Sequence, residues 1–130
     1  MRGFDTRWLM AGSAILLAVP GLICTFLPIE MLRWIGAPPS AALVLPLQAL
    51  GALYLGFAML NWMGRGGLMG GIYGRPVAMG NLAHFLIVAI ALCKALASGP
   101  APALYWPLAI VYAFFATAFG LILFRHPVRP

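Results

Sequence analysis

Apolar residues gather in four long stretches along the chain, separated by short segments that carry the charges and most of the glycines. A helix rises about 1.5 Å per residue, so about 20 apolar residues cross the roughly 30 Å hydrocarbon core of a bilayer. The four stretches of this length are residues 8–27, 42–63, 76–97 and 105–124. The pattern therefore predicts an all-α membrane protein, an antiparallel bundle of four transmembrane helices that forms a single transmembrane domain over residues 1–130.

A fifth, shorter helix is predicted over residues 28–36, between the first two spans. Pro28 suits the first turn of a helix, and Gly36 is a typical residue just after its end. Within the segment, apolar residues form one stripe, while Glu30 and Arg33 can face water. We expect a helix that lies in the membrane interface, either as an anchor or as a lid over a pocket.

Composition supports a bilayer environment. The chain is 64% hydrophobic and 8% charged, whereas soluble domains carry about 25% charged residues. The basic residues are dispersed, so no basic run is present that could follow a nucleic-acid backbone. The partner is therefore predicted to be the lipid bilayer, with no nucleic acid. Abundant Ala, Gly, Pro and Arg indicate a GC-rich bacterial genome and hence a bacterial inner membrane.

The basic residues are distributed unevenly about the predicted spans. One side has two of them, Arg33 and Lys94. The positive-inside rule then predicts that both termini and the loop after the second span are cytoplasmic. Arg65 and Arg75 in that loop are expected to contact lipid headgroups. The basic residues on the predicted cytoplasmic side are Arg2, Arg7, Arg65, Arg75, Arg125 and Arg129.

The same loop is rich in glycine and invites comparison with nucleotide-binding motifs. A dinucleotide fingerprint would start at Gly64 and Gly66, but its third glycine is replaced by Met69. A phosphate-binding loop would need a lysine followed by a serine or threonine, but these two positions are Ile72 and Tyr73. Both nucleotide motifs fail, so the loop is interpreted as a connection and no cofactor is predicted.

Four of the polar residues in the second and third predicted spans are candidates for one site. Tyr54 and Asn61 are seven residues apart and share one helix face, as do Asn81 and His84, which are three apart. Because a short loop joins these spans, we expect them to pack antiparallel, with the four side chains in one ligand-binding polar cluster. His84 can form a structural hydrogen bond between helices or have a functional role.

Catalytic signatures are absent from the sequence. The two acids, Asp5 and Glu30, lie outside the predicted spans, and no catalytic triad or metal-ligand spacing is visible. A single intramembrane histidine also lacks the second ligand of a bis-histidine haem. A membrane enzyme is therefore the least supported of the function classes, and no metal site is predicted. Lys94 lies on the same predicted side as Glu30, so an ion pair between them is topologically allowed.

The stretch "LQALGALYLGFAMLNWM" at residues 47–63, together with the helix order, resembles small bacterial four-helix membrane proteins of the broad DoxX-like group. The resemblance implies a four-helix inner-membrane protein and little specific chemistry. Two functions stay open. The first is an accessory or oligomer-forming bundle, which associates with itself or with another membrane protein. It is suggested by the missing catalytic groups and by a stripe of small residues, Ala109, Ala113, Ala116 and Gly120. The second is a binder or transporter of a small apolar molecule or lipid through the cluster around His84.

Overall fold

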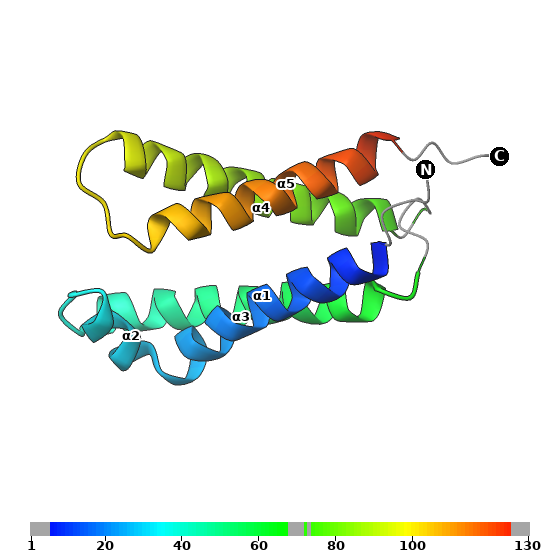
Figure 1. Ribbon diagram of the computed structural model, residues 1–130. Helices are drawn as coiled ribbons and strands as arrows, with labels where there is room; N and C mark the ends of the chain where they lie inside the picture. The colour runs from blue at the N-terminus through cyan, green and yellow to red at the C-terminus, as the bar shows by residue number, and fades with distance from the viewer. Residues whose placement is uncertain (1–5, 68–71, 73, 126–130) are drawn as a thin grey trace. The chain divides into compact units, whose positions relative to one another are not determined.

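The computed structural model describes residues 6–67, 72 and 74–125, and the regular secondary structure among them is entirely helical (Figure 1). The all-α fold class predicted from the sequence is confirmed, with four long apolar helices and a short one after the first. The predicted features at Arg2, Asp5, Met69, Tyr73 and Arg129 lie outside the described residues. The helices are α1 (Thr6–Phe26), α2 (Pro28–Trp34), α3 (Ala41–Gly64), α4 (Gly74–Ala97) and α5 (Tyr105–Arg125).

The four long helices are long and apolar enough to cross a membrane. They also expose large apolar side chains, among them Trp8, Leu45, Met63 and Phe124, each at 70% or more of its surface. Such side chains would be poorly solvated by water over so large a surface, whereas lipid tails solvate them well. These helices make the chain a multi-pass membrane protein.

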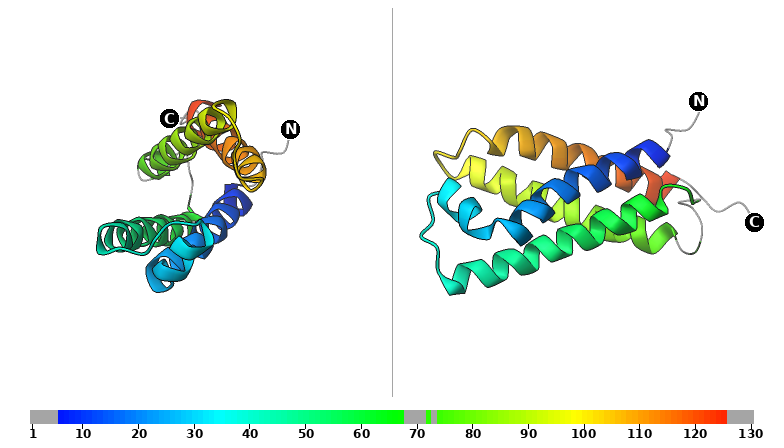
Figure 2. Two further views of the ribbon diagram at one scale, coloured as in Figure 1. Left: turned by 90° about the vertical axis from the view of Figure 1, so that its left-hand side faces the viewer. Right: turned by 90° about the horizontal axis from the view of Figure 1, so that it is seen from below.

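Contacts within the chain divide it into two compact units, residues 1–65 and 66–130. In the first unit α1 packs against α3, and α2 contacts both (Figures 1 and 2). In the second unit α4 packs against α5. Each unit is a hairpin of two long antiparallel helices. The single domain expected from the sequence stays a prediction.

The α1–α3 hairpin depends on a close backbone approach at Gly51. A Cβ atom at this position would lie 2.8 Å from the Thr25 backbone nitrogen and 2.9 Å from the Gly21 carbonyl oxygen. Real side chains do not approach backbone atoms so closely, so only glycine fits. The neighbouring Gln48 side chain donates a hydrogen bond of 3.3 Å to the Thr25 carbonyl. Small residues that let helix backbones approach are a common basis of helix association in membranes.

Helix α2 begins at Pro28 as predicted and ends at Trp34, before the predicted end at residue 36. Pro28 occupies the first turn, where its missing N–H has no partner to lose. Gly36 has φ +75°, a conformation that favours glycine, and the Ala37 N–H donates 2.9 Å to the Leu32 carbonyl. The Gly36 N–H donates to the Arg33 carbonyl, which completes a Schellman-type end. Leu32 is buried, and its apolar side chain helps hold α2 against α1 and α3.

The α4–α5 hairpin has an aromatic core. Phe85 on α4 is fully buried and stacks on Phe115 and Phe119 of α5, with ring centroids 4.9 Å and 5.8 Å apart. Stacked aromatic pairs contribute about 0.5–1.5 kcal/mol beyond their buried area. The second hairpin is therefore held by bulky rings, where the first is held by a glycine contact.

The glycine contact predicts a position-specific effect of adding one methyl group. We expect Gly51→Ala to lower the free energy of unfolding by about 1–3 kcal/mol, because the methyl group would overlap backbone atoms of α1. The measurement is unfolding of the purified protein in mixed detergent micelles, followed by circular dichroism.

Gly56→Ala is the matched control on the same helix, because nothing lies within 4 Å of a Cβ atom at Gly56. It should leave stability unchanged or raise it slightly, since alanine is a better helix former than glycine. Equal stability of the two variants would contradict the close approach.

Candidate functional site

The four residues predicted to form one polar cluster are divided between the two units. Tyr54 and Asn61 lie on α3 in the first unit, and Asn81 and His84 lie on α4 in the second. Both asparagines are completely buried, and the other two side chains are partly buried. The convergence of all four on one site stays a prediction, and each pair has its own surroundings.

Asn61 links α3 to α1 through a buried hydrogen-bond chain. Its Nδ2 donates to the Ser13 Oγ at 2.9 Å, and that hydroxyl donates to the Met10 carbonyl at 2.9 Å. Both side chains are fully buried. An amide at membrane depth needs a hydrogen-bond partner, and a serine of the neighbouring helix provides one. In this part of the site the polar groups serve helix packing.

Ser13 is a residue that sequence reasoning missed. The sequence pattern does not indicate a hydrogen-bond partner for Ser13, and a serine in an apolar stretch is unremarkable. Ser13 could have been found as a polar residue on the helix that packs against Asn61. Pairing the two residues, however, requires the register of α1 against α3.

Asn81 also uses its amide within the membrane-spanning part of the chain. Its Nδ2 donates 2.9 Å to the Val77 carbonyl, one turn earlier in α4. Such a bond back to the preceding turn supplies an acceptor without a second helix. This bond gives Asn81 a structural role within α4.

His84 lies among aromatic rings between α4 and α5. Its ring centroid is 5.2 Å from that of Phe85, in an edge-on arrangement, and 5.8 Å from that of Tyr112. Tyr112 is buried and comes from α5. The imidazole and the phenol thus bring nitrogen and oxygen atoms into an otherwise apolar ring cluster. Tyr112 is a second residue that the sequence analysis did not select, because it is one aromatic residue among the phenylalanines of the last span.

The predicted ion pair and headgroup contacts involve exposed or partly exposed residues. Glu30 is exposed on α2 in the first unit, and Lys94 is exposed in the last turn of α4 in the second, so their pairing stays a prediction. Arg75 is exposed in the first turn of α4. The Arg65 guanidinium lies 3.7 Å from the centroid of the Trp62 ring and donates a 2.6 Å hydrogen bond to the Trp62 carbonyl. Arg65 is therefore held in place at the end of α3.

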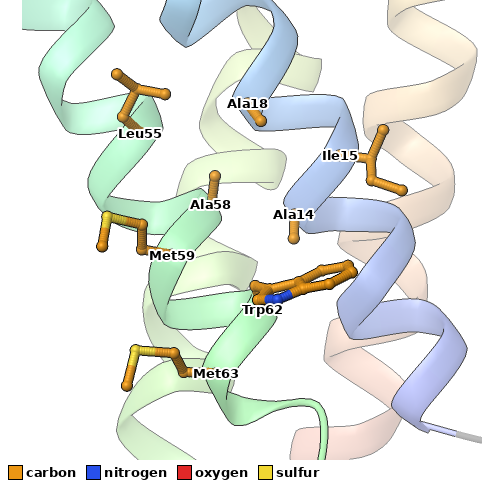
Figure 3. Close-up of a pocket in the computed structure, with 8 residues that line it drawn as sticks. All are labelled: Ala14, Ile15, Ala18, Leu55, Ala58, Met59, Trp62 and Met63. Atoms are coloured by element: carbon orange, nitrogen blue, oxygen red, sulfur yellow. The ribbon is translucent and has the colours of Figure 1, made fainter.

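An apolar groove of about 290 Å³ lies between α1 and α3 (Figure 3). Alanines and larger apolar side chains of both helices line it. All of its lining residues belong to the first unit. Its lining residues are Ala14, Ile15, Ala18, Leu55, Ala58, Met59, Trp62 and Met63.

Metal binding finds no support in the described part of the chain, where no three His, Cys, Asp or Glu side chains lie close enough together to hold an ion. The chain matches no family model, and no curated protein or solved structure is significantly similar to it. The resemblance to DoxX-like proteins therefore stays a prediction, and the functional argument rests on the geometry of the two hairpins.

The buried chain from Asn61 to Ser13 predicts an energetic coupling between the two residues. In a double-mutant cycle of Ser13→Ala and Asn61→Leu, we expect a coupling of about 0.6 kcal/mol, with an upper range of about 1.7 kcal/mol. The measurement is unfolding of the wild type, both single variants and the double variant in detergent micelles.

A second cycle of Ser13→Ala with Thr117→Val is the control, because the Thr117 hydroxyl donates its hydrogen bond to the Ala113 carbonyl of its own helix. This pair should behave additively. Additive behaviour of Ser13 and Asn61 as well would contradict the interhelix bond.

Proposed function

We propose that the protein is a non-catalytic membrane protein that acts through helix–helix association in the bilayer, as an oligomer or as an accessory subunit. The observation that carries the proposal is the uncovered surface of α3. Three residues of α3 are buried, compared with seven of the shorter α1. This surface includes Ala52 and Gly56, both exposed and one turn apart. A small-xxx-small pair on an uncovered face favours close approach of another helix.

The small-residue stripe of α5 is a weaker candidate for association. Ala109 and Ala116 are already buried. A Cβ atom at Gly120 would lie 3.7 Å from the Leu82 side chain of α4. Much of this stripe is therefore used inside the second hairpin, although Ala113 is exposed. The α3 surface is the better candidate because both of its small residues are uncovered.

We further propose a bacterial inner-membrane location with both termini in the cytoplasm. Six of the eight basic residues lie on the predicted cytoplasmic side, which supports this orientation. In the first unit, Gly64 at the end of α3 lies near Met10 at the start of α1. The exposed indoles of Trp8 and Trp62 belong to this same end of the hairpin, and indoles favour the headgroup level.

Association through α3 predicts that a bulky residue at Gly56 separates the protomers. We expect Gly56→Leu to reduce the oligomeric fraction several-fold, because the side chain would keep the partner helix at a distance. The measurements are native mass spectrometry from mild detergent and co-purification of two differently tagged copies of the chain.

Ala42→Leu is the control, because Ala42 is exposed near the start of the same helix and outside the small-residue pair. It should associate like the wild type. A wild-type protein that is monomeric in native membranes, or a Gly56→Leu variant that associates normally, would refute association through this face.

A second candidate function is binding or transport of a small apolar molecule or lipid near His84. It is supported by the ring cluster, in which His84 and Tyr112 place polar atoms in apolar surroundings between α4 and α5. Such surroundings are typical of ligand pockets, where a few polar groups orient an apolar ligand.

For this candidate, His84→Phe is the informative substitution, because it keeps an aromatic ring and removes both ring nitrogens. We expect it to abolish retention of a co-purifying ligand in native mass spectrometry while the helical content is preserved. Thr117→Val, which removes an exposed polar group from α5, should retain the ligand. A His84→Phe protein that keeps every bound molecule would eliminate this candidate.

A further inference from the structure

The groove between α1 and α3 has the length and chemistry of a site for an acyl chain. On α3 it extends from Leu55 to Met63, which is about 12 Å along the helix axis. One leaflet of the hydrocarbon core is about 15 Å deep, so the groove extends through most of one leaflet. Its lining is almost entirely apolar, which disfavours a polar ligand within it.

The groove ends at an aromatic ring and a fixed cation. Figure 3 shows the Trp62 indole lying across the gap toward α1, next to Ala14. The Arg65 guanidinium is held at this ring by its 3.7 Å contact and by the 2.6 Å hydrogen bond to the Trp62 carbonyl. A guanidinium carries five N–H donors in a planar fork that matches a phosphate group. The apolar groove thus leads directly to a group that binds anions.

A second cation lies at the same end of the hairpin. A Cβ atom at Gly64 would lie 3.1 Å from the Met10 side chain, so the end of α3 adjoins the first turns of α1. Arg7 is exposed, about one helical turn before Met10. Glu30, which is the one carboxylate among the described residues, is on α2 at the opposite end. The described charges of the first unit at this end, Arg7 and Arg65, are both positive.

We propose that this groove binds one acyl chain of an anionic phospholipid, whose phosphate group contacts Arg65 and lies near Arg7. The chain fills the space over Ala14, Ala18 and Ala58, and the Trp62 ring marks the level of the headgroup. Acyl-chain contacts are common to all phospholipids, so selectivity for an anionic headgroup comes from the arginines. The site uses neither residue of the proposed association pair, Ala52 and Gly56, nor any residue of the ring cluster at His84.

Lipid competition tests the headgroup part of the site. Delipidated protein in mild detergent receives equal amounts of phosphatidylglycerol and phosphatidylcholine with chains of different mass, and bound lipid is read by native mass spectrometry. The wild type should retain one phosphatidylglycerol in preference. Arg65→Gln should reduce this preference about fivefold, in line with the contribution of one basic residue at a membrane surface.

Arg33→Gln is the matched control, because it removes an exposed cation from α2 at the other end of the same hairpin. It should keep the wild-type preference. Equal retention of the two lipids by the wild type, or equal effects of the two arginine substitutions, would overturn the proposal.

A second variant tests the groove itself. Ala18→Leu places a larger side chain in its lining and should lower retention of both lipids, while Ala42→Leu on the exposed part of α3 should not. Circular dichroism and gel filtration establish that both variants are folded. If Ala18→Leu leaves lipid retention unchanged, the acyl chain does not lie in the groove. If it instead removes a dimer mass, a second copy of the chain is the occupant, and either result overturns the proposal.

Discussion

The register of α1 against α3 is the constraint on which the first hairpin depends. Gly51 sets the distance between the helices, because any side chain there would meet the backbone of Thr25 and Gly21. Once this contact is fixed, the antiparallel helices bring Asn61 opposite Ser13 and Gly64 opposite Met10. One close approach near the middle of α3 thus determines which side chains meet over the rest of its length.

The two hairpins are held together in the bilayer by different interactions. Lipid tails are as apolar as leucine, so burial of apolar surface alone does not drive helices together in a bilayer. The first hairpin relies on small residues and a buried polar bond between its helices. The second relies on the stacked rings of Phe85, Phe115 and Phe119, whose preferred geometry gives specificity that simple apolar contact lacks.

The sequence predicted the helices because their length and their end signals are local properties. Twenty apolar residues indicate a span, and Pro28 with Gly36 delimits α2 without reference to any other segment. Side-chain partners are not local. In helices that are apolar on every face, no hydrophobic stripe marks the packed side, so Asn61 could be recognised as buried while Ser13 could not be recognised as its partner. The groove was unpredictable for the same reason, since it arises from alanines of one helix lying opposite alanines of another.

The two sides of α3 connect the proposed lipid site to this register. Asn61 and Trp62 are consecutive, so their side chains point about 100° apart around the helix. The Asn61 side chain connects α3 to α1 by a hydrogen bond, and the Trp62 side chain lines the end of the groove. A change in the distance between α1 and α3 would therefore alter the bond and the groove together. Lipid in the groove and the Asn61–Ser13 bond would then stabilise the same arrangement of the two helices, because a ligand that binds only the packed hairpin adds its binding free energy to the stability of that hairpin.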